Sequence, residues 1–248
     1  MLNIFYFVLA TECAFISAVM RPTRILALTG LSLSLLGTAN ADIETSISAG
    51  YTSDYVFRGT NNGDDLFDAT IDVSGSGSLG GLGDIDWGAG LWLAGFGGGA
   101  NEMDIYFSAS KSLSDNLDLT VGVTNYSYYG DWAGTPDDLE PYVSVGTSLG
   151  GISLGLGAYF DQSETLDHDI YWELTAGYES ELSGLGTLGL SGVIGHFDDE
   201  GVGTYYGIGA GLSIAVSDSI TVTPHITHTV DGATGDETFG GVSVGFGF

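Results

Sequence analysis

Cysteine and positive charge are almost absent from this sequence, and both absences narrow its chemistry. The 248 residues include one cysteine, Cys13, and four lysines and arginines against 32 aspartates and glutamates. Cys13 lies in an N-terminal stretch that we expect to be removed, so the mature chain has no thiol for a disulfide, a catalytic thiolate or a cysteine-bound metal. So acidic a surface repels nucleic acid, and we expect no nucleic-acid partner.

The N-terminal residues 1-41 have the layout of a secretory signal peptide. Arg21 and Arg24 form a short basic region, residues 25–36 form an apolar run, and a small-x-small site ends at Ala41. This layout predicts export from the cytoplasm and cleavage after Ala41.

A second apolar run precedes this signal, and Met20 stands directly before its basic region. We therefore expect translation to begin at Met20. The alternative is that residues 1–19 form a membrane anchor. Glu12 and a length near the lower limit for a spanning helix argue against that alternative.

The remaining chain, residues 42–248, is strongly acidic but is expected to fold. It keeps 31 of the 32 acidic residues and only two cations, Arg58 and Lys111, which gives a formal charge of −29. Its many aromatic and β-branched residues argue against disorder. No apolar run in it approaches the length of a spanning helix, so helical membrane spans are excluded.

Alternation of apolar and small residues recurs along this part of the chain. At the C-terminus, Val242, Val244, Phe246 and Phe248 alternate with glycine and serine. A soluble β-sandwich would pack the apolar face against a second sheet and carry charged residues on the other face. An apolar outer face with a small, polar inner face is instead the signature of a transmembrane β-barrel.

Runs of this kind predict twelve strands, an even number, each long enough to cross a bilayer when tilted. The predicted strands are 43-55, 66-76, 84-96, 102-111, 116-129, 139-149, 151-161, 168-180, 185-197, 204-215, 218-230 and 237-248. The predicted fold is therefore all-β: a closed antiparallel up-and-down transmembrane β-barrel of about 12 strands, formed by residues 42-248.

The connections between these runs alternate in character. One set is rich in Asp, Asn and Gly and comprises 56-65, 97-101, 130-138, 162-167, 198-203 and 231-236, whereas the other connections are mostly shorter and less acidic. Outer-membrane barrels have long external loops and short periplasmic turns. With the N-terminus in the periplasm, the acidic set is expected outside the cell.

Aromatic residues gather near the ends of the predicted strands, for example Tyr55, Tyr126, Tyr171 and Tyr205. Two interpretations stay open for them. They could form girdles at the membrane interfaces, as barrels of this class often have. They could equally be ordinary core residues.

The segment Ser53-Asp54-Tyr55-Val56-Phe57-Arg58-Gly59 resembles the S-D-Y-x-F-R-G opening of the Gcw_chp family of bacterial outer-membrane proteins. The segment Glu102-Met103-Asp104-Ile105-Tyr106 is similar to a second family strand. Thr60-Asn61-Asn62-Gly63 departs from the family pattern after Arg-Gly. The resemblance implies an outer-membrane barrel and implies neither a substrate nor a reaction.

Arg58 is predicted to anchor the first external loop together with Asp54, Tyr55 and Phe57. A guanidinium group suits carboxylates and carbonyls, and Asp54 and three further aspartates lie within ten residues of it. Direct contact with a ligand is the alternative role. Lys111 has the parity of the lipid-facing side, and its ammonium group is expected to extend to the membrane–water interface.

The parity of the alternation predicts which residues line the lumen. The candidates for the lining and for ion selectivity are Asp72, Asp86, Trp92, Asp104, Tyr106, Asp118, Tyr142, Tyr159, Tyr171, Glu173 and Glu179. Carboxylates with almost no opposing positive charge predict a preference for cations if the lumen is open.

Catalytic motifs are missing. No histidine pair has the helical zinc spacing, and His225 and His228, three apart on a predicted strand, are expected on opposite faces. His168 and His196 are placed near the external rim, but no G-x-S-x-G marks a nucleophile. We therefore predict no catalytic residue, no enzymatic activity and no cofactor. Acidic external loops offer oxygen ligands for Ca²⁺ or Mg²⁺ without any defined spacing, so no metal ligand is assigned.

These features predict a porin-like passive channel for small solutes in the bacterial outer membrane. The alternative is a non-conducting structural or adhesive barrel whose acidic loops bridge through divalent cations to lipopolysaccharide phosphates. Bulky Tyr and Trp side chains plugging the lumen would favour that alternative. Expected partners are outer-membrane lipid, lipopolysaccharide and, through the C-terminal Phe248, the barrel-assembly machinery.

Overall fold

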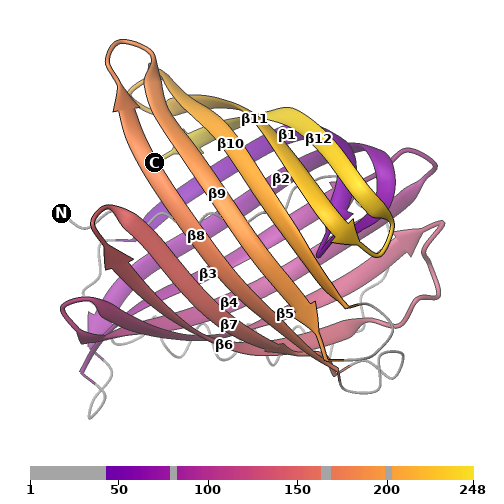
Figure 1. Cartoon of the computed structure of the whole chain (residues 1–248), viewed down its shortest axis with the longest axis horizontal. Helices are drawn as coiled ribbons and strands as arrows, with labels where there is room; N and C mark the ends of the chain where they lie inside the picture. The colour runs from indigo at the N-terminus through magenta and orange to yellow at the C-terminus, as the bar shows by residue number, and fades with distance from the viewer. Residues whose placement is uncertain (1–42, 79–82, 163–168, 199–202) are drawn as a thin grey trace.

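A computed structural model describes residues 43–78, 83–162, 169–198 and 203–248 of the chain, which form twelve antiparallel strands (Figure 1). The strands are β1 (Glu44–Phe57), β2 (Thr60–Ser78), β3 (Asp84–Gly95), β4 (Ala100–Ser114), β5 (Leu117–Gly130), β6 (Asp138–Leu149), β7 (Ile152–Phe160), β8 (Ile170–Leu182), β9 (Gly186–Phe197), β10 (Thr204–Ser217), β11 (Ile220–Gly232) and β12 (Gly235–Gly247). The predicted signal peptide and His168 lie outside the described residues.

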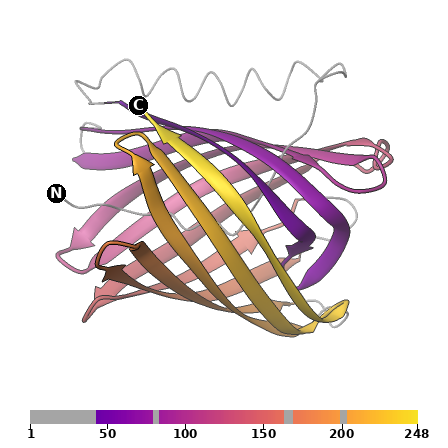
Figure 2. The ribbon, with the colours of Figure 1, turned by 90° about the horizontal axis from the view of Figure 1, so that it is seen from above.

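Each strand pairs with its neighbours in sequence, and β1 pairs with β12, so the sheet closes into a barrel. The closing register runs from Ser46 opposite Gly247 to Thr52 opposite Gly241. Figure 2 shows β12 alongside β1 at this seam. The Phe248 amide also donates a hydrogen bond to the Thr45 carbonyl at 3.0 Å, so the two ends of the described chain meet. The predicted closed, twelve-stranded up-and-down topology is confirmed.

The two faces of the sheet differ as the alternation predicts. Large apolar side chains are exposed on the outer face of nearly every strand, among them Ile71, Val121, Leu154, Leu174, Leu190, Ile208, Ile226 and Val242. The inner face carries Gly, Ser, Thr, Tyr and carboxylates at the alternate positions. This exposed apolar band is what a bilayer would cover. No helix long and apolar enough to cross a membrane occurs in the described part of the chain.

The prediction of a long first loop over 56-65 was wrong. Strand β1 continues to Phe57 and β2 begins at Thr60, which leaves a two-residue turn. The polar stretch that reads as loop in the sequence pairs with β1 instead, with Asp54 opposite Asp64 and Tyr55 opposite Gly63. The predicted loop 231-236 is likewise mostly strand. Backbone pairing therefore outweighs the low strand propensity of Asn, Asp and Gly at these positions.

Candidate functional site in the barrel lumen

The interior of the barrel changes character from one end to the other. We call the end where Thr45 and Phe248 meet the terminal end and the opposite end the loop end. On β3, Trp92 is 3% exposed and faces the loop-end half, whereas Asp86 on the same face is exposed near the terminal end. On β2, Leu66 is fully buried and Ser76 is exposed. The loop-end half of the lumen is therefore packed, and the terminal-end half is lined by solvated side chains.

An irregularity in the first hairpin turns its tip into the lumen. Gly63 and Leu66 are three positions apart, so regular alternation would put them on opposite faces, yet both lie on the inner side. Asp65, which lies between them, has a positive φ of 54°. Tyr55, opposite Gly63, consequently stacks on Phe96 with ring centroids 4.7 Å apart. The barrel's buried apolar cluster forms around this contact and comprises Tyr55, Leu66, Trp92, Ala94, Phe96 and Ala100.

The turn residues of this hairpin extend the tip across the lumen. Arg58 and Gly59 both have left-handed backbones, with φ of 48° and 75°. A Cβ on Gly59 would lie 2.7 Å from the Tyr205 ring, so only glycine fits against β10 at this point. We call residues 55–59 the hairpin tip.

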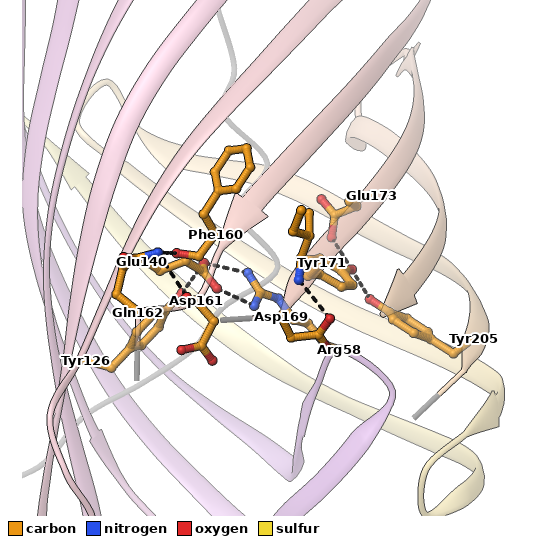
Figure 3. Close-up of polar contacts among 11 residues, drawn as sticks. Arg58, Tyr126, Glu140, Phe160, Asp161, Gln162, Asp169, Tyr171, Glu173 and Tyr205 are labelled. Atoms are coloured by element: carbon orange, nitrogen blue, oxygen red, sulfur yellow. Dashed lines mark hydrogen bonds and ion pairs between the residues drawn. The ribbon is translucent and has the colours of Figure 1, made fainter. Parts of the chain in front are cut away.

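The hairpin tip ends in a buried ion pair with the part of the barrel formed by β6, β7 and β8, which we call the far wall (Figure 3). The two terminal nitrogens of Arg58 donate to the two carboxylate oxygens of Glu140 on β6, at 2.6 and 2.7 Å. The exposed fractions of the two side chains are 13% and 3%. Tyr126 on β5 donates a third hydrogen bond to Glu140 at 3.2 Å. Such bidentate, charge-assisted pairs are the strongest hydrogen bonds that side chains form with each other.

Aromatic rings surround the guanidinium group. Its central carbon lies 4.8 Å from the ring centroid of Phe57, 5.0 Å from that of Tyr159 and 4.1 Å from that of Tyr171. Cation–π attraction strengthens when the partners are shielded from water, as they are here. We call Glu140, Tyr159 and Tyr171 the cage.

The charge of Arg58, which lies in the turn outside the strands, is secured by Glu140. Burial by itself lowers the pKa of a guanidinium, but the adjacent carboxylate and its hydrogen bonds outweigh burial and raise the pKa of Arg58 well above its usual value. Arg58 therefore stays protonated across the physiological range. Its partner in the structure is Glu140 on the distant strand β6 and not a neighbouring loop aspartate.

Inward glycines make room for the inward tyrosines. A Cβ on Gly90 would lie 2.2 Å from the Tyr106 ring, and the Tyr106 hydroxyl passes over this glycine to donate to Asp72 two strands away. A Cβ on Gly195 would lie 2.2 Å from Tyr205 and 2.6 Å from the Tyr171 hydroxyl. The large and small residues of the inner wall therefore fit together across neighbouring strands.

The residues predicted to line the lumen all lie on the inner face, as the pairing register shows. Nine of the eleven fall into two groups. Trp92, Asp104, Tyr106, Tyr142, Tyr159, Tyr171 and Glu173 belong to the packed part or border it, whereas Asp86 and Glu179 are exposed toward the terminal end. Asp118 accepts a hydrogen bond from Ser112 at 2.6 Å. One oxygen of buried Asp104 has no hydrogen-bond partner.

Glu140 lies in the predicted strand 139-149 but was not among the residues predicted to line the lumen. Glu140 is buried on the inner face of β6. Its parity matches that of the predicted lumen residue Tyr142, so the alternation alone could have placed it inside. Buried Glu102 and Asp68, also on the inner face, were missed as well. Asp54 accepts hydrogen bonds from Ser53 at 2.6 Å and Asn61 at 3.4 Å, which ties the two strands of the first hairpin together.

The aromatic residues near the strand ends resolve into two sets. Tyr55, Tyr171 and Tyr205 are buried inside the barrel and Tyr126 bonds Glu140 there, so these four are interior residues and not a girdle. Trp172, Tyr178 and Tyr206 are exposed on the outer face.

The described histidines form no joint site. His225 faces the lumen near Thr52 Oγ1, at 3.3 Å, while His228 lies on the outer face, as predicted. His196 bonds Thr204 Oγ1 at 2.9 Å. No group of three or more potential metal-ligating His, Cys, Asp or Glu side chains occurs within the described ranges.

The comparisons with known proteins concern the fold alone. No protein-family model and no curated protein sequence matches the chain. The structure is similar to the NanC porin, with a TM-score of 0.51 and 10% identity over 82% of this chain and 98% of that one. It is also similar to an outer-membrane channel from Pseudomonas putida F1, with a TM-score of 0.52 and 10% identity over 84% and 95% of the two chains. The chain has the fold of outer-membrane β-barrel channels.

Proposed function

We propose that this protein is a passive, porin-like channel of the bacterial outer membrane that prefers small cations. The observation that supports the preference is the charge of the inner wall. Among the described residues, Arg58 is the one lysine or arginine on the inner face, and Glu140 neutralises it. The exposed carboxylates of Asp86 and Glu179 have no such compensation in the terminal-end half, so they attract cations and repel anions.

The hairpin tip is the constriction of this channel. It lies in the loop-end half of the lumen, and its contacts with the far wall narrow any path past it. With the terminal end in the periplasm, the constriction lies toward the outside of the cell. Solutes that pass it would be small.

Planar bilayer recording with asymmetric KCl tests the channel and its preference together. The proposal expects conductance and a reversal potential of the sign set by K⁺ permeation. A reversal potential that favours Cl⁻ would reject the cation preference.

A second function is favoured by the packed loop-end half itself. An aromatic plug is what a non-conducting structural or adhesive barrel would have, with acidic loops that bridge through divalent cations to lipopolysaccharide. Liposome swelling separates the two functions. Influx of small sugars through the reconstituted protein supports the channel, and its absence together with silent bilayers supports the structural barrel.

The remaining elements of the proposal concern location and assembly. The exposed apolar band would contact outer-membrane lipid, and Phe248, 80% exposed at the terminal end, is available to the barrel-assembly machinery. We assign no catalytic residue, enzymatic activity or cofactor. Deleting Phe248 should lower the amount of folded protein in outer-membrane fractions if that contact guides assembly.

A further inference from the structure

The lumen wall opposite the hairpin tip has the shape and charge to hold a guanidinium group. Glu140 on β6 supplies a buried carboxylate, and Tyr159 on β7 and Tyr171 on β8 supply two ring faces. All three residues come from strands other than those of the first hairpin. Figure 3 shows Glu140 and Tyr171 on either side of the Arg58 guanidinium. The cage therefore belongs to the far wall alone.

Contacts outside the hairpin tip hold the cage rings in place. The Tyr171 hydroxyl donates to Glu173 at 2.7 Å and bonds the Tyr205 hydroxyl at 2.8 Å. The Tyr159 ring lies 5.6 Å from that of Tyr171 and 5.2 Å from that of Tyr142. A site whose groups are fixed by strands and by each other is ordered before its occupant arrives.

The present occupant, in contrast, is carried by a strained turn. Arg58 has a left-handed φ of 48°, which residues other than Gly, Asn and Asp rarely adopt. Such a conformation persists where surrounding contacts hold it. The ion pair and ring contacts of Arg58 are those contacts, so an equivalent group from solution would compete for them.

We propose that the cage is a recognition site for guanidinium-bearing solutes and that Arg58 occupies it as a tethered ligand. The inference assigns a solute class to the channel proposed above. Its biological role rests on that proposed function, although binding itself needs no conduction. A guanidinium is preferred to an ammonium because it is planar, donates two parallel hydrogen bonds to Glu140 and stacks on Tyr171. A solute that displaces Arg58 releases the hairpin tip from the far wall.

Methylguanidinium is the probe, added to the folded barrel in detergent. The Arg58→Ala variant empties the cage and leaves the far wall unchanged, and intrinsic fluorescence and the midpoint of thermal unfolding report binding. We expect Arg58→Ala to bind methylguanidinium about tenfold more tightly than methylammonium, which lacks the planar fork. We also expect wild-type protein to bind the probe about tenfold more weakly than the variant, because the tethered side chain competes at high effective concentration.

The double variant Arg58→Ala/Glu140→Gln is the matched control and should lose the preference for methylguanidinium. Equal binding of the two cations to Arg58→Ala, or unchanged binding in the double variant, would overturn the proposal. If Arg58→Ala does not fold in plain buffer, its refolding yield is measured with each cation. Recovery with methylguanidinium alone supports the site, and recovery with neither or with both rejects it.

The channel function can fail independently of this site. A barrel that binds methylguanidinium in the cage but shows no cation-selective conductance would reject the proposed function and leave the site standing. A cation-selective channel whose Arg58→Ala variant ignores the probe would do the reverse.

Discussion

The two halves of the lumen are built from the same twelve strands and differ in the side chains that face inward. Toward the loop end the inner positions are Trp92, Tyr171, Tyr205 and Glu140, all buried, and toward the terminal end they are mostly Ser, Thr, Gly and exposed Asp or Glu. Strand number sets the width of a barrel, and the inner side chains decide whether that width is filled. One half can therefore carry the stability and the other the access to solvent.

The largest effect is expected from removing the charge of Glu140. Glu140→Gln leaves the buried Arg58 guanidinium without its counter-ion, and breaking a buried pair in this way costs roughly 3–5 kcal/mol. Urea unfolding of the refolded barrel, followed by tryptophan fluorescence, measures the loss. Glu179→Gln, at an exposed position on the same face, is the control. Equal losses of unfolding free energy in the two variants would show that the two halves do not differ in their contribution to stability.

A smaller effect is expected from filling one of the inward glycines. Gly195→Ala places a methyl group within 2.2 Å of Tyr205, and the forced movement should cost about 1–3 kcal/mol. Gly245, on the inner face near the terminal end, has nothing within 4 Å of its would-be Cβ, so Gly245→Ala should be tolerated. The same urea titration compares them. A Gly195→Ala barrel as stable as Gly245→Ala would show that the tyrosines are not tightly fitted.

Loss of a single hydroxyl in the packed half should matter less. Tyr126→Phe removes the hydrogen bond to Glu140 and should lower the free energy of unfolding by about 1 kcal/mol. Tyr178, exposed on the outer face, provides the control Tyr178→Phe. Identical unfolding curves for the two variants would mean that Tyr126 contributes nothing to the ion pair.

The smallest effect on stability is expected from the open half, where the change should appear in selectivity. Asp86→Asn with Glu179→Gln should alter the free energy of unfolding by less than about 0.5 kcal/mol, because both side chains are exposed. The cation preference in bilayer recordings should fall, since two wall charges are gone. Lys111→Gln, a charge change outside the lumen, should leave the preference unaltered. If the double variant keeps its full cation preference, the residues that set the selectivity lie in the packed half and not in the open half.

Much of the fold could be predicted from the sequence because alternation is a local signal. The face of a residue such as Val242 or Gly241 can be inferred without knowing its partner strand. Parity predicted Asp72, Tyr106 and Tyr159 on the inner face, and the pairing register puts these three on one face of the sheet. The same signal predicted a closed barrel, because one face of the strands is apolar and the other carries small and polar residues. These inferences need only the period of two and the side-chain types.

The centre of the candidate site could not be predicted in the same way. The contact between Arg58 and Glu140 joins residues on opposite walls, so it depends on closure and on the break in alternation at Asp65. That break is carried by a left-handed aspartate inside a polar stretch that resembles a loop. Aspartate tolerates this conformation better than most residues, but nothing in the composition of residues 60–65 requires it.

The contrast between the two halves is tested most directly by thiol labelling, because the only cysteine of the chain lies in the predicted signal peptide. Ser76→Cys and Thr229→Cys each place one thiol on the inner face, the first exposed in the terminal-end half and the second 4% exposed in the loop-end half. A water-soluble maleimide should label Cys at position 76 at least about tenfold faster than at position 229, because a packed site must open before it reacts. Equal labelling rates would contradict a lumen that is packed at one end and solvated at the other.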